Sequence, residues 1–439
     1  MLGSLKRFIP RRARALYHRW LALAATLWYG RPSRHLIVIG ITGTDGKTTT
    51  ALMLTSILQA AGHRVGLSSS LFFQVAEERW LNETHMTMPG RFALQRLLRQ
   101  MVRAGCRYAV IEVSSEGLLQ HRHSGIDFDM ALITNISPEH LKSHGTFEAY
   151  RSAKGRLFGK IIKGADKVID GQNVKKATIV NLDDPEAAYF LKFWAEEHHG
   201  VTLSAAPEVP MQTKDKLRVW AAADIVIEAH TSHFQVDGQK VIVPMPGRYN
   251  ISNALEAIAA TAVLRIPWPS RIKGIADLDE LPGRFEEVPT NKSWRVVVDY
   301  AVTPKALESF YQALQSSGVK SIIAVFGAAG GGRDTWKRPE VGKIASQYCR
   351  RIILTTDDPY DDDPAEIADA IQAGVPMDRR SNIEIVLDRR EAMRRAMSLA
   401  EAGDVVAITG MGAETTMVVK GKKVPWSDAG VAKELISAT

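Results

Sequence analysis

The 439-residue sequence predicts an α/β fold built on parallel sheets. Apolar, strand-like runs alternate with helical patterns between residues 36 and 150, and again between residues 294 and 410. Glycine and polar residues follow these runs, as they do where a parallel sheet binds ligand at the carboxyl ends of its strands. The chain is too long for one ordinary core, so we expect two or three domains.

The first half of the chain opens with an apolar strand, LIVIG at 36–40, which leads into a glycine-rich turn and a helix. A second amphipathic helix, near 94–103, ends at Gly105. The runs YAVIEV (108–113) and MALITN (130–135) are predicted strands that end in polar residues. Their ends are expected to meet at one edge of the sheet.

The pattern changes between residues 176 and 244, where short alternating runs indicate antiparallel strands with a hairpin turn at Asp237-Gly238. The run RIPWPSR at 265–271 contains two prolines and predicts a domain boundary. Strand and helix patterns then alternate again, which predicts a second doubly wound domain. The expected division is an N-terminal helical segment (1–34), a central domain (35–268) and a C-terminal domain (269–439).

Composition excludes several classes of protein. With only Cys106 and Cys349, the chain has no disulfide framework and no cysteine zinc site, and it fits a reducing cytosol. The net charge is +8, and much of it lies at the start of the chain, in Lys6, Arg7, Arg11, Arg12, Arg14 and Arg19. Elsewhere the charges are mixed, so we expect no nucleic-acid partner.

The segment 16–29, LYHRWLALAATLWY, is apolar and rich in tryptophan. Its uninterrupted apolar part is too short to cross a bilayer, and it lacks the cleavage site of a secretory signal. Two interpretations remain open. The helix packs on the protein's own body, the commoner case, or residues 1–30 rest on an anionic membrane surface. We expect a cytoplasmic protein, peripheral to the membrane in the second case.

A phosphate-binding turn is predicted directly after the first strand. It comprises Gly43, Thr44, Asp45, Gly46, Lys47, Thr48 and Thr49. The longer pattern G-x-x-x-x-G-K-[ST] fails because Ile41 replaces its first glycine. Backbone N–H groups at the helix start would hold phosphate oxygens, Lys47 would neutralise them, and the Thr48 hydroxyl would ligate Mg²⁺. The alternative, an ordinary glycine turn, fits the strand–turn–helix context less well.

Glu112 and His140 lie at the same predicted sheet edge as Lys47. A carboxylate in an apolar strand is costly unless it is paired or ligates a metal, so Glu112 is predicted to be a metal ligand, with a buried salt bridge as the alternative. A lone histidine is more often structural than a ligand. For His140 the two interpretations are about equal from the residues alone.

Lys154 shares one helical row with Tyr150, Phe158 and Ile161. A lysine in an apolar row either extends its amine to solvent or has a lowered pKa. A neutral amine can take up CO₂ and become a carbamate, an anion that can ligate Mg²⁺. From the residues alone, extension to solvent is the favoured interpretation.

Many motifs in one order resemble the Mur ligase family, and most closely its MurE-type members. They include GTDGKTT, EVSSEGLLQHR (112–122), TNISPEHLKSHGTFEAYRSAKGRLF (134–158) and NLDD (181–184). The C-terminal half adds PGRYNISNALEAIA, LPGRFE, VDYAVTPKALE, VFGAAGGGRDTWKRP, DDPYDDDP, GMGAE and KVPWSD. The similarity runs from about Ile37 to the C-terminus.

The resemblance implies an ATP-dependent amide ligase of peptidoglycan precursor synthesis, with a central P-loop ATPase domain and a C-terminal Rossmann-like domain. It implies two Mg²⁺ ions, held by Thr48, Glu112, His140 and carbamylated Lys154. Asn135, Asn253, Arg284 and Asp299 match positions that meet ATP. Thr87, Ser114, Gln120 and Arg122 match residues that hold a UDP-muramoyl peptide, and Arg333, Asp357, Asp358 and Glu414 match the site for a free amino acid. A monomer is expected.

Several positions depart from the family pattern. The family has a uridine-binding domain of roughly a hundred residues before the P-loop, where about 35 residues stand in this sequence, so uridine recognition is in question. Val302 replaces a histidine, Met411 a lysine and Ala413 a second histidine. The diaminopimelate-selecting DNPR is DDPY at 357–360. Because the arginine is missing, lysine or another amino acid becomes the expected substrate.

Two other functions stay open. A folylpolyglutamate-synthase-like ligase would also lack the uridine domain, although EVSSEG and SPEHLKSHG argue against it. A non-catalytic nucleotide-binding subunit at the membrane would explain Val302 and Met411.

Overall fold

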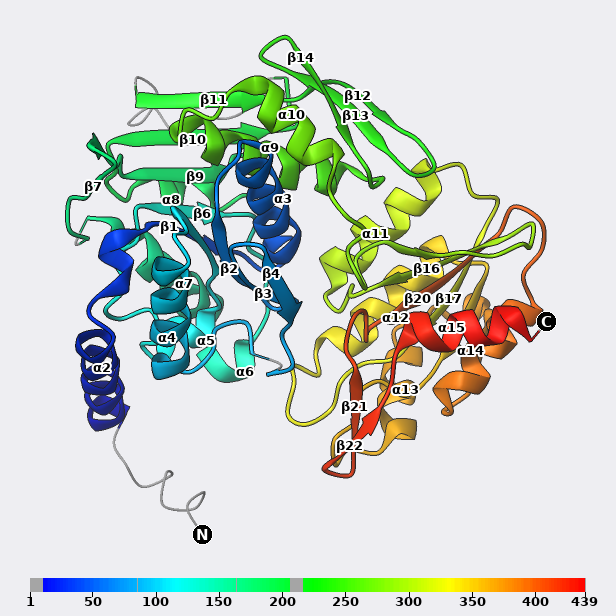
Figure 1. Ribbon diagram of the computed structural model, residues 1–439. Helices are drawn as coiled ribbons and strands as arrows, with labels where there is room; N and C mark the ends of the chain where they lie inside the picture. The colour runs from blue at the N-terminus through cyan, green and yellow to red at the C-terminus, as the bar shows by residue number, and fades with distance from the viewer. Residues whose placement is uncertain (1–10, 85, 163, 206–215, 439) are drawn as a thin grey trace.

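The computed structural model describes residues 11–84, 86–162, 164–205 and 216–438, which fold into two α/β lobes. The first lobe, blue to green in Figure 1, is built on a nine-stranded sheet, and the second, yellow to red, on a six-stranded one. This confirms the predicted fold class.

The nine-stranded sheet places the phosphate-binding turn near its middle. Its strand order is β11-β10-β9-β6-β1-β5-β2-β3-β4, parallel from β11 to β2 and antiparallel at β3 and β4. The strands are β1 (Ile37–Thr42), β2 (Val65–Ser68), β3 (Phe72–Val75), β4 (Glu78–Leu81), β5 (Tyr108–Glu112), β6 (Met130–Ile133), β9 (Ala177–Asn181), β10 (Glu197–Thr202) and β11 (Leu217–Ala221).

Helices cover both faces of this sheet. One face carries α3 (Lys47–Ala60), α9 (Arg248–Val263) and α10 (Trp268–Ala276). The other carries α4 (Arg91–Arg103), α7 (Phe147–Ile161) and α8 (Ala187–Leu191). Because both faces are covered, all six residues of β1 are buried, which explains its unbroken apolar sequence. Two short helices, α5 (Ser115–Leu119) and α6 (Leu141–His144), follow β5 and β6.

The interpretation of residues 176–244 was half right. β12 (Ala223–Ile227), β13 (Ser232–Val236) and β14 (Gln239–Val243) form the expected antiparallel sheet, with positive φ at Asp237 and Gly238 in the turn. The residues before them were wrongly assigned. β9, β10 and β11 extend the main sheet in parallel, and α8 lies in the crossover between β9 and β10.

The six-stranded sheet has the order β15-β16-β20-β17-β18-β19, and all its pairs are parallel except β15 with β16. Its strands are β15 (Glu286–Val288), β16 (Arg295–Asp299), β17 (Ile322–Phe326), β18 (Arg351–Leu354), β19 (Ile383–Ile385) and β20 (Val405–Thr409). The helices α11 (Pro304–Ser316), α12 (Lys337–Tyr348) and α13 (Pro364–Gln372) pack on one face, and α14 (Arg389–Ser398) and α15 (Asp428–Ser437) on the other. A hairpin, β21 (Thr416–Val419) and β22 (Lys422–Pro425), precedes α15.

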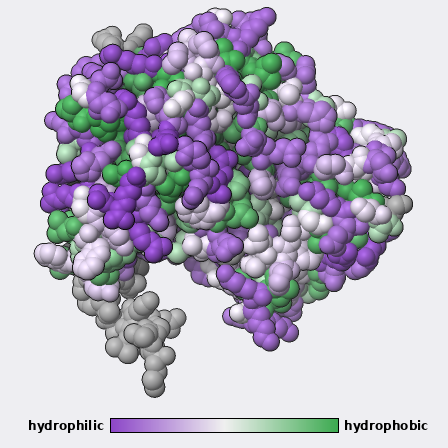
Figure 2. Space-filling model, viewed as in Figure 1, coloured by the Kyte–Doolittle hydropathy of each residue, from purple (hydrophilic) through white to green (hydrophobic). Residues whose placement is uncertain are grey.

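The N-terminal helix α2 (Arg11–Trp28) lies along the first lobe and contacts α4. A short helix, η1 (Pro32–His35), joins it to β1 and also contacts α4. Among the described residues, no helix is both long and apolar enough to cross a membrane. Figure 2 shows hydrophilic residues over most of the visible face, with hydrophobic ones in separate small areas.

The helix α10 packs closely on α3 of the first lobe. A methyl group at Gly274 would lie 2.3 Å from the Ile57 Cα, so only glycine allows this approach. The helix begins at the predicted boundary of residue 268, yet it contacts the central lobe. The division at 268 and 269 stays a prediction, and this packing favours a boundary after Ala276.

The Gly274→Ala variant should therefore lose stability, by about 2 kcal/mol or more, because the backbone of α3 cannot yield to the added methyl group. Gly159→Ala is the matched control, since that helical glycine has no heavy atom within 3.4 Å of an added methyl. It should gain about 0.5–1 kcal/mol. Thermal unfolding of both variants checks this. Equal shifts in the same direction would contradict the close packing.

Candidate functional site between the two lobes

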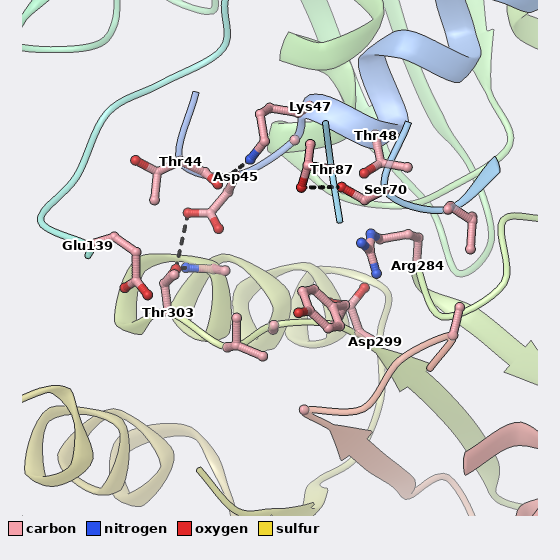
Figure 3. A pocket seen from close by; sticks show the side chains of 18 of the residues that line it. Thr44, Asp45, Lys47, Thr48, Ser70, Thr87, Glu139, Arg284, Asp299 and Thr303 are labelled. Atoms are coloured by element: carbon pink, nitrogen blue, oxygen red, sulfur yellow. Dashed lines mark hydrogen bonds between the residues drawn. The ribbon is translucent and has the colours of Figure 1, made fainter. Parts of the chain in front are cut away.

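A cavity of about 1050 Å³ lies between the two lobes and is lined by both. Figure 3 shows Lys47 and Thr48 on one side, at the start of α3, and Arg284, Asp299 and Thr303 on the other. Such a volume is large enough for a nucleotide and part of a second ligand. The site thus combines a phosphate-binding turn with groups from a separate lobe.

Most of the predicted site residues line this cavity. They are Thr44, Asp45, Gly46, Lys47, Thr48, Thr49, Thr87, Ser114, Arg122, Asn135, His140, Asn253, Arg284, Asp299, Arg333, Asp357, Asp358 and Glu414. Four others are not among the lining residues: Gly43, Glu112, Gln120 and Lys154. Gly43 directly precedes the lining residue Thr44, and the other three form hydrogen bonds with Ser70, Arg122 and Gly43, respectively.

The phosphate-binding turn has the backbone that an anion site requires. Gly46 is the N-cap residue of α3, with φ of 81°. No side chain accepts a hydrogen bond from the N–H groups at this helix start. The Lys47 Nζ donates to the Thr44 carbonyl at 2.9 Å. A helix start of this form favours phosphate oxygens. The turn therefore fits a triphosphate.

Residues from β6 and α9 hold the turn in place. The Asp45 N–H donates to the Asn135 Oδ1 at 3.0 Å, and the Asn135 amide and Thr134 hydroxyl donate to the Asp45 carbonyl. A methyl group at Gly46 would lie 2.4 Å from the Asn253 Oδ1. The predicted Asn135 and Asn253 therefore touch the turn itself.

Lys154 is completely buried on α7 and does not reach solvent, so the interpretation favoured from the residues alone was wrong. Its Nζ donates to the Gly43 carbonyl at 2.5 Å and lies 4.5 Å from the centre of the Tyr150 ring. Burial lowers the pKa of the Lys154 amine well below its usual value, and the charge of Lys47 lowers it further. This lysine therefore has a strong tendency to be neutral, the form that reacts with CO₂.

Glu112 is fully buried and accepts two hydrogen bonds from Ser70, from its N–H at 3.1 Å and its hydroxyl at 3.0 Å. The Ser70 hydroxyl also contacts Thr87 at 2.9 Å. No ion pair of Glu112 occurs among the described residues, so the alternative of a buried salt bridge is wrong there. Its role as a metal ligand stays a prediction.

His140 begins α6 in a left-handed conformation, with φ of 56°, which turns the chain at the sheet edge. Its Nδ1 lies 4.0 Å from the Glu116 Oε1. Burial lowers the pKa of His140 to about 4, against the opposing effect of Glu116. The ring is therefore neutral at pH 7, as a metal-ligating histidine must be. No group of three His, Cys, Asp or Glu side chains suited to a metal occurs in the described part of the chain.

Opposite the turn, Arg284 and Asp299 form the wall from the second lobe. The guanidinium of Arg284 lies 4.6 Å from the centre of the Tyr300 ring, and Asp299 accepts from the Phe285 N–H at 2.7 Å. Burial raises the pKa of Asp299 to about 6, although Arg284 opposes this. Such a carboxylate and guanidinium can hold hydroxyl and ring nitrogen groups of a nucleotide.

Three side chains of the second lobe make polar contacts with the first lobe around the cavity. The Thr303 hydroxyl donates to the Asp45 Oδ2 at 3.1 Å, and the Lys337 Nζ lies 3.1 Å from the Glu139 Oε1. Asp334 accepts from the N–H groups of Leu141 and Lys142, each at 2.9 Å. The second lobe therefore holds the segment that carries His140.

The predicted amino-acid site also lies in this wall. Burial raises the pKa of Asp357 to about 6, and Asp358 accepts from the Val418 N–H at 2.7 Å. Arg333 and Glu414 line the same side, together with Val302 and Met411. The two apolar replacements thus face the cavity and add no charge to it.

Three of the four predicted acceptor residues, Ser114, Gln120 and Arg122, flank α5, and the fourth, Thr87, contacts Ser70. The Ser114 hydroxyl caps α5 by accepting from the Gly117 N–H. Gln120 is half-buried and does not line the cavity, and it accepts from the Arg122 side chain at 2.9 Å, which positions that arginine at the wall. Arg122 also donates to the Met88 carbonyl.

Comparison with known protein families decides the identity of this arrangement. Residues 41–261 match the Mur ligase middle domain, and residues 283–412 match the Mur ligase glutamate ligase domain. This chain belongs to the Mur ligase family. Mur ligases are ATP-dependent enzymes that use Mg²⁺, so the chain is an ATP-dependent ligase, and the expected family is confirmed.

Similar sequences and structures agree with this assignment. The Mur ligase is 34% identical to a UDP-N-acetylmuramyl-tripeptide synthetase of Roseiflexus over 95% of this chain and 82% of the relative. It is 36% identical to a UDP-N-acetylmuramoyl-L-alanyl-D-glutamate–2,6-diaminopimelate ligase of Chlorobaculum tepidum, over 93% and 78% of the two chains. A folylpolyglutamate synthase structure of Mycobacterium tuberculosis shares the fold, with a TM-score of 0.68 and 17% identity over 97% and 99% of the chains.

Some residues of the site were missed from the sequence. Thr303 could have been found, because a Thr-Pro pair directly before a helical pattern predicts a helix cap, and this threonine does cap α11. Ser70 carried no such signal, since SSSLFF resembles an ordinary loop. Lys337 and Asp334 contact the first lobe from almost 200 positions away, which no local pattern indicates.

The raised pKa of Asp299 should make the stability of the protein depend on pH. As pH rises, the unfolded chain loses this proton near its ordinary pKa of 3.8 and the folded chain near 6, so unfolding becomes easier between those values. The Asp299→Asn variant lacks this titrating group. Between pH 4.5 and pH 7 its free energy of unfolding should therefore fall by about 2 kcal/mol less than that of the unchanged protein.

Urea unfolding of the ligand-free protein at the two pH values measures this. The exposed Asp369→Asn on α13 is the control and should behave as the unchanged protein. The same pH dependence in Asp299→Asn and the control would contradict the raised pKa.

Proposed function

We propose that this Mur ligase adds a free amino acid to the terminal carboxylate of a UDP-muramoyl-peptide-like acceptor, at the expense of ATP, in peptidoglycan precursor synthesis. The observation that carries the proposal is the cavity between the lobes, in which the phosphate-binding turn faces Arg284 and Asp299. The relatives named above, which are a tripeptide synthetase and a diaminopimelate ligase, support the acceptor class.

The reaction needs two transfers in one enclosed space. An acceptor carboxylate oxygen bonds to the γ-phosphorus of ATP, the bond to the bridging oxygen breaks, and ADP leaves. The amino nitrogen then bonds to the acyl carbon, the carbon–oxygen bond to phosphate breaks, and inorganic phosphate and a proton leave. Lys47 and the N–H groups at the start of α3 offset the charge of the transferred phosphoryl group.

Magnesium fits the residues near the turn, and when bound it would neutralise the phosphate oxygens. The donors are the Thr48 hydroxyl, the neutral His140 ring, Glu112 and Lys154 after carbamylation. Two ions are our proposal. The burial of Lys154, which lowers the pKa of its amine well below the usual value, is the physical support for the carbamate. Because Lys154 contacts the Gly43 carbonyl, a negative group there would also change the position of the turn.

The contacts between the lobes should align the reactants. Asp334 and Lys337 form hydrogen bonds with the segment around His140, and Thr303 forms one with Asp45. Closure of this kind brings the acyl group and the amine together and excludes water. Thr87, Ser114 and Arg122 would hold the acceptor on the first lobe, and Gln120 would position Arg122.

The amino acid site lacks the arginine that the family uses for a second carboxylate. Tyr360 stands there, among the carboxylates of Asp357, Asp358 and Glu414. We infer that Arg333 binds the carboxylate of the amino acid and that a side chain without a second carboxylate, such as that of lysine, is preferred. We place the enzyme in the cytoplasm, as a monomer, with its N-terminal helix in contact with the membrane surface.

Release of ADP across acceptor and amino-acid pairs tests the proposal. With UDP-N-acetylmuramoyl-L-alanyl-D-glutamate, ATP, Mg²⁺ and lysine, the purified protein should release ADP at least tenfold faster than with diaminopimelate or without an acceptor. Lys47→Ala should lower this rate by at least about 100-fold. ADP release that depends on a folate instead would favour the folylpolyglutamate-synthase-like alternative. ATP binding without phosphate release for any pair would favour a non-catalytic subunit.

Lys154→Ala should lose activity by about 100-fold or more if the carbamate is needed. Short carboxylic acids such as acetate should restore part of it, because they can replace the carbamate oxygens in the space left by the side chain. Lys160→Ala, on the same helix, is the control and should keep full activity. Full activity in Lys154→Ala would rule out the carbamate.

A further inference from the structure

Helix α2 presents a row of large apolar side chains to solvent. Leu16, Trp20, Leu23 and Leu27 follow the spacing i, i+4, i+7 and i+11, so they lie on one side of the helix. All four are exposed, Trp20 by 65% and Leu27 by 62%. A surface helix normally has polar residues on its outward side. An exposed row of large apolar side chains is therefore typical of an interaction surface.

The orientation of the helix is fixed by its opposite side. Ala22, Ala25 and Thr26 are buried, and a methyl group at Gly125 would overlap the Thr26 side chain. The helix contacts α4, and η1 continues the attachment, because the Ser33 hydroxyl accepts from the Asp127 N–H at 3.1 Å. The apolar row therefore faces outward in the folded protein.

The charge around this row has one sign. Residues 1–35 contain eight Lys and Arg residues and no Asp or Glu, while the other 404 residues contain 48 of each kind. The entire net charge of +8 thus belongs to this segment. Arg19 on α2 and Arg31 beyond it are exposed, and Arg34, also exposed, pairs with Asp127 at 3.3 Å. Their partner should be anionic and also accept apolar side chains.

We propose that α2 docks on an anionic lipid bilayer, with its axis parallel to the surface. Leu16, Trp20, Leu23 and Leu27 enter the boundary between headgroups and acyl chains, and the arginines contact the anionic headgroups. Tyr17 and Trp28, also exposed, lie on the flank of the row, where aromatic rings with a polar atom suit the membrane interface. The helix lies on the membrane, since no described helix can cross it.

Other occupants fit these observations less well. In a two-fold dimer through α2, two segments of eight positive charges each would repel. A nucleic acid would match the charge but leave the apolar row exposed to water. A lipid surface satisfies both features together.

The docked helix is linked to the acceptor side of the cavity. It packs on α4, and Arg91 at the start of α4 donates to the Gln120 carbonyl. Arg122, at the cavity wall, follows two residues later. Docking therefore holds the acceptor side of the enzyme at the membrane. The docking itself rests on the surface of α2 alone, whereas its consequence for the acceptor rests on the proposed function.

Sedimentation of the full chain with lipid vesicles tests the docking. The protein should bind vesicles of phosphatidylglycerol and phosphatidylcholine (3:7) at least tenfold more strongly than pure phosphatidylcholine, and added salt should weaken this binding. The double variant Trp20→Glu/Leu27→Glu should lose at least tenfold of it. The matched control, Trp194→Glu/Met377→Glu, changes two exposed residues elsewhere and should bind as the unchanged protein.

Thermal unfolding and ADP release should be the same for both double variants, which separates docking from folding and from catalysis. Absence of binding to the anionic vesicles would overturn the proposal, and so would equal binding by the two double variants. A concentration-dependent dimer in sedimentation velocity that Trp20→Glu/Leu27→Glu abolishes would also overturn it, in favour of a second copy of the chain.

Discussion

The site depends on one short piece of backbone, the turn from Gly43 to Gly46, and on the groups that fix its shape. Lys154 and Asn135 hold it through the carbonyls of Gly43 and Asp45, Asn253 lies against Gly46, and Thr303 reaches Asp45 from the second lobe. Lys154 and Asn135 thus act on the main chain of the turn, and Thr303 acts on the carboxylate of Asp45. This explains why residues far apart in the sequence, and on both lobes, converge on so few atoms.

The parallel sheets and the phosphate-binding turn were predictable because their signals are local. Unbroken apolar runs such as β1 follow from burial on both faces, and a glycine pair before a helix gives the turn. The direction of β9, β10 and β11 was not predictable, because short strands with the same sequence pattern can pair either way. The outcome depends on where the intervening segments cross over.

The residues of the candidate site also divide into those with a local sequence signal and those that depend on long-range packing. Lys47 and Thr48 could be located because they follow a buried strand and a glycine turn, and Asn135 through the family resemblance, whereas Ser70, Asp334 and Lys337 depend on how distant segments pack. For Lys154 the helical row was right and the favoured outcome wrong, since no sequence pattern shows whether the end of a row is open to water. Family resemblance supplied roles for most of the site residues, and the structure supplied the contacts through which those residues act.

The contacts between the lobes affect the rate at which the enzyme can release its products. Those at the cavity rim are few and polar: a hydroxyl on Asp45, an ammonium on Glu139, and the Asp334 carboxylate on two N–H groups. Interactions of this kind form and break without exposing apolar area, so the free energy of opening depends mainly on the packing of Tyr249 of α9 against the core of the second lobe. We therefore expect opening to pace the release of products, which would make the catalytic rate fall as the solvent becomes more viscous.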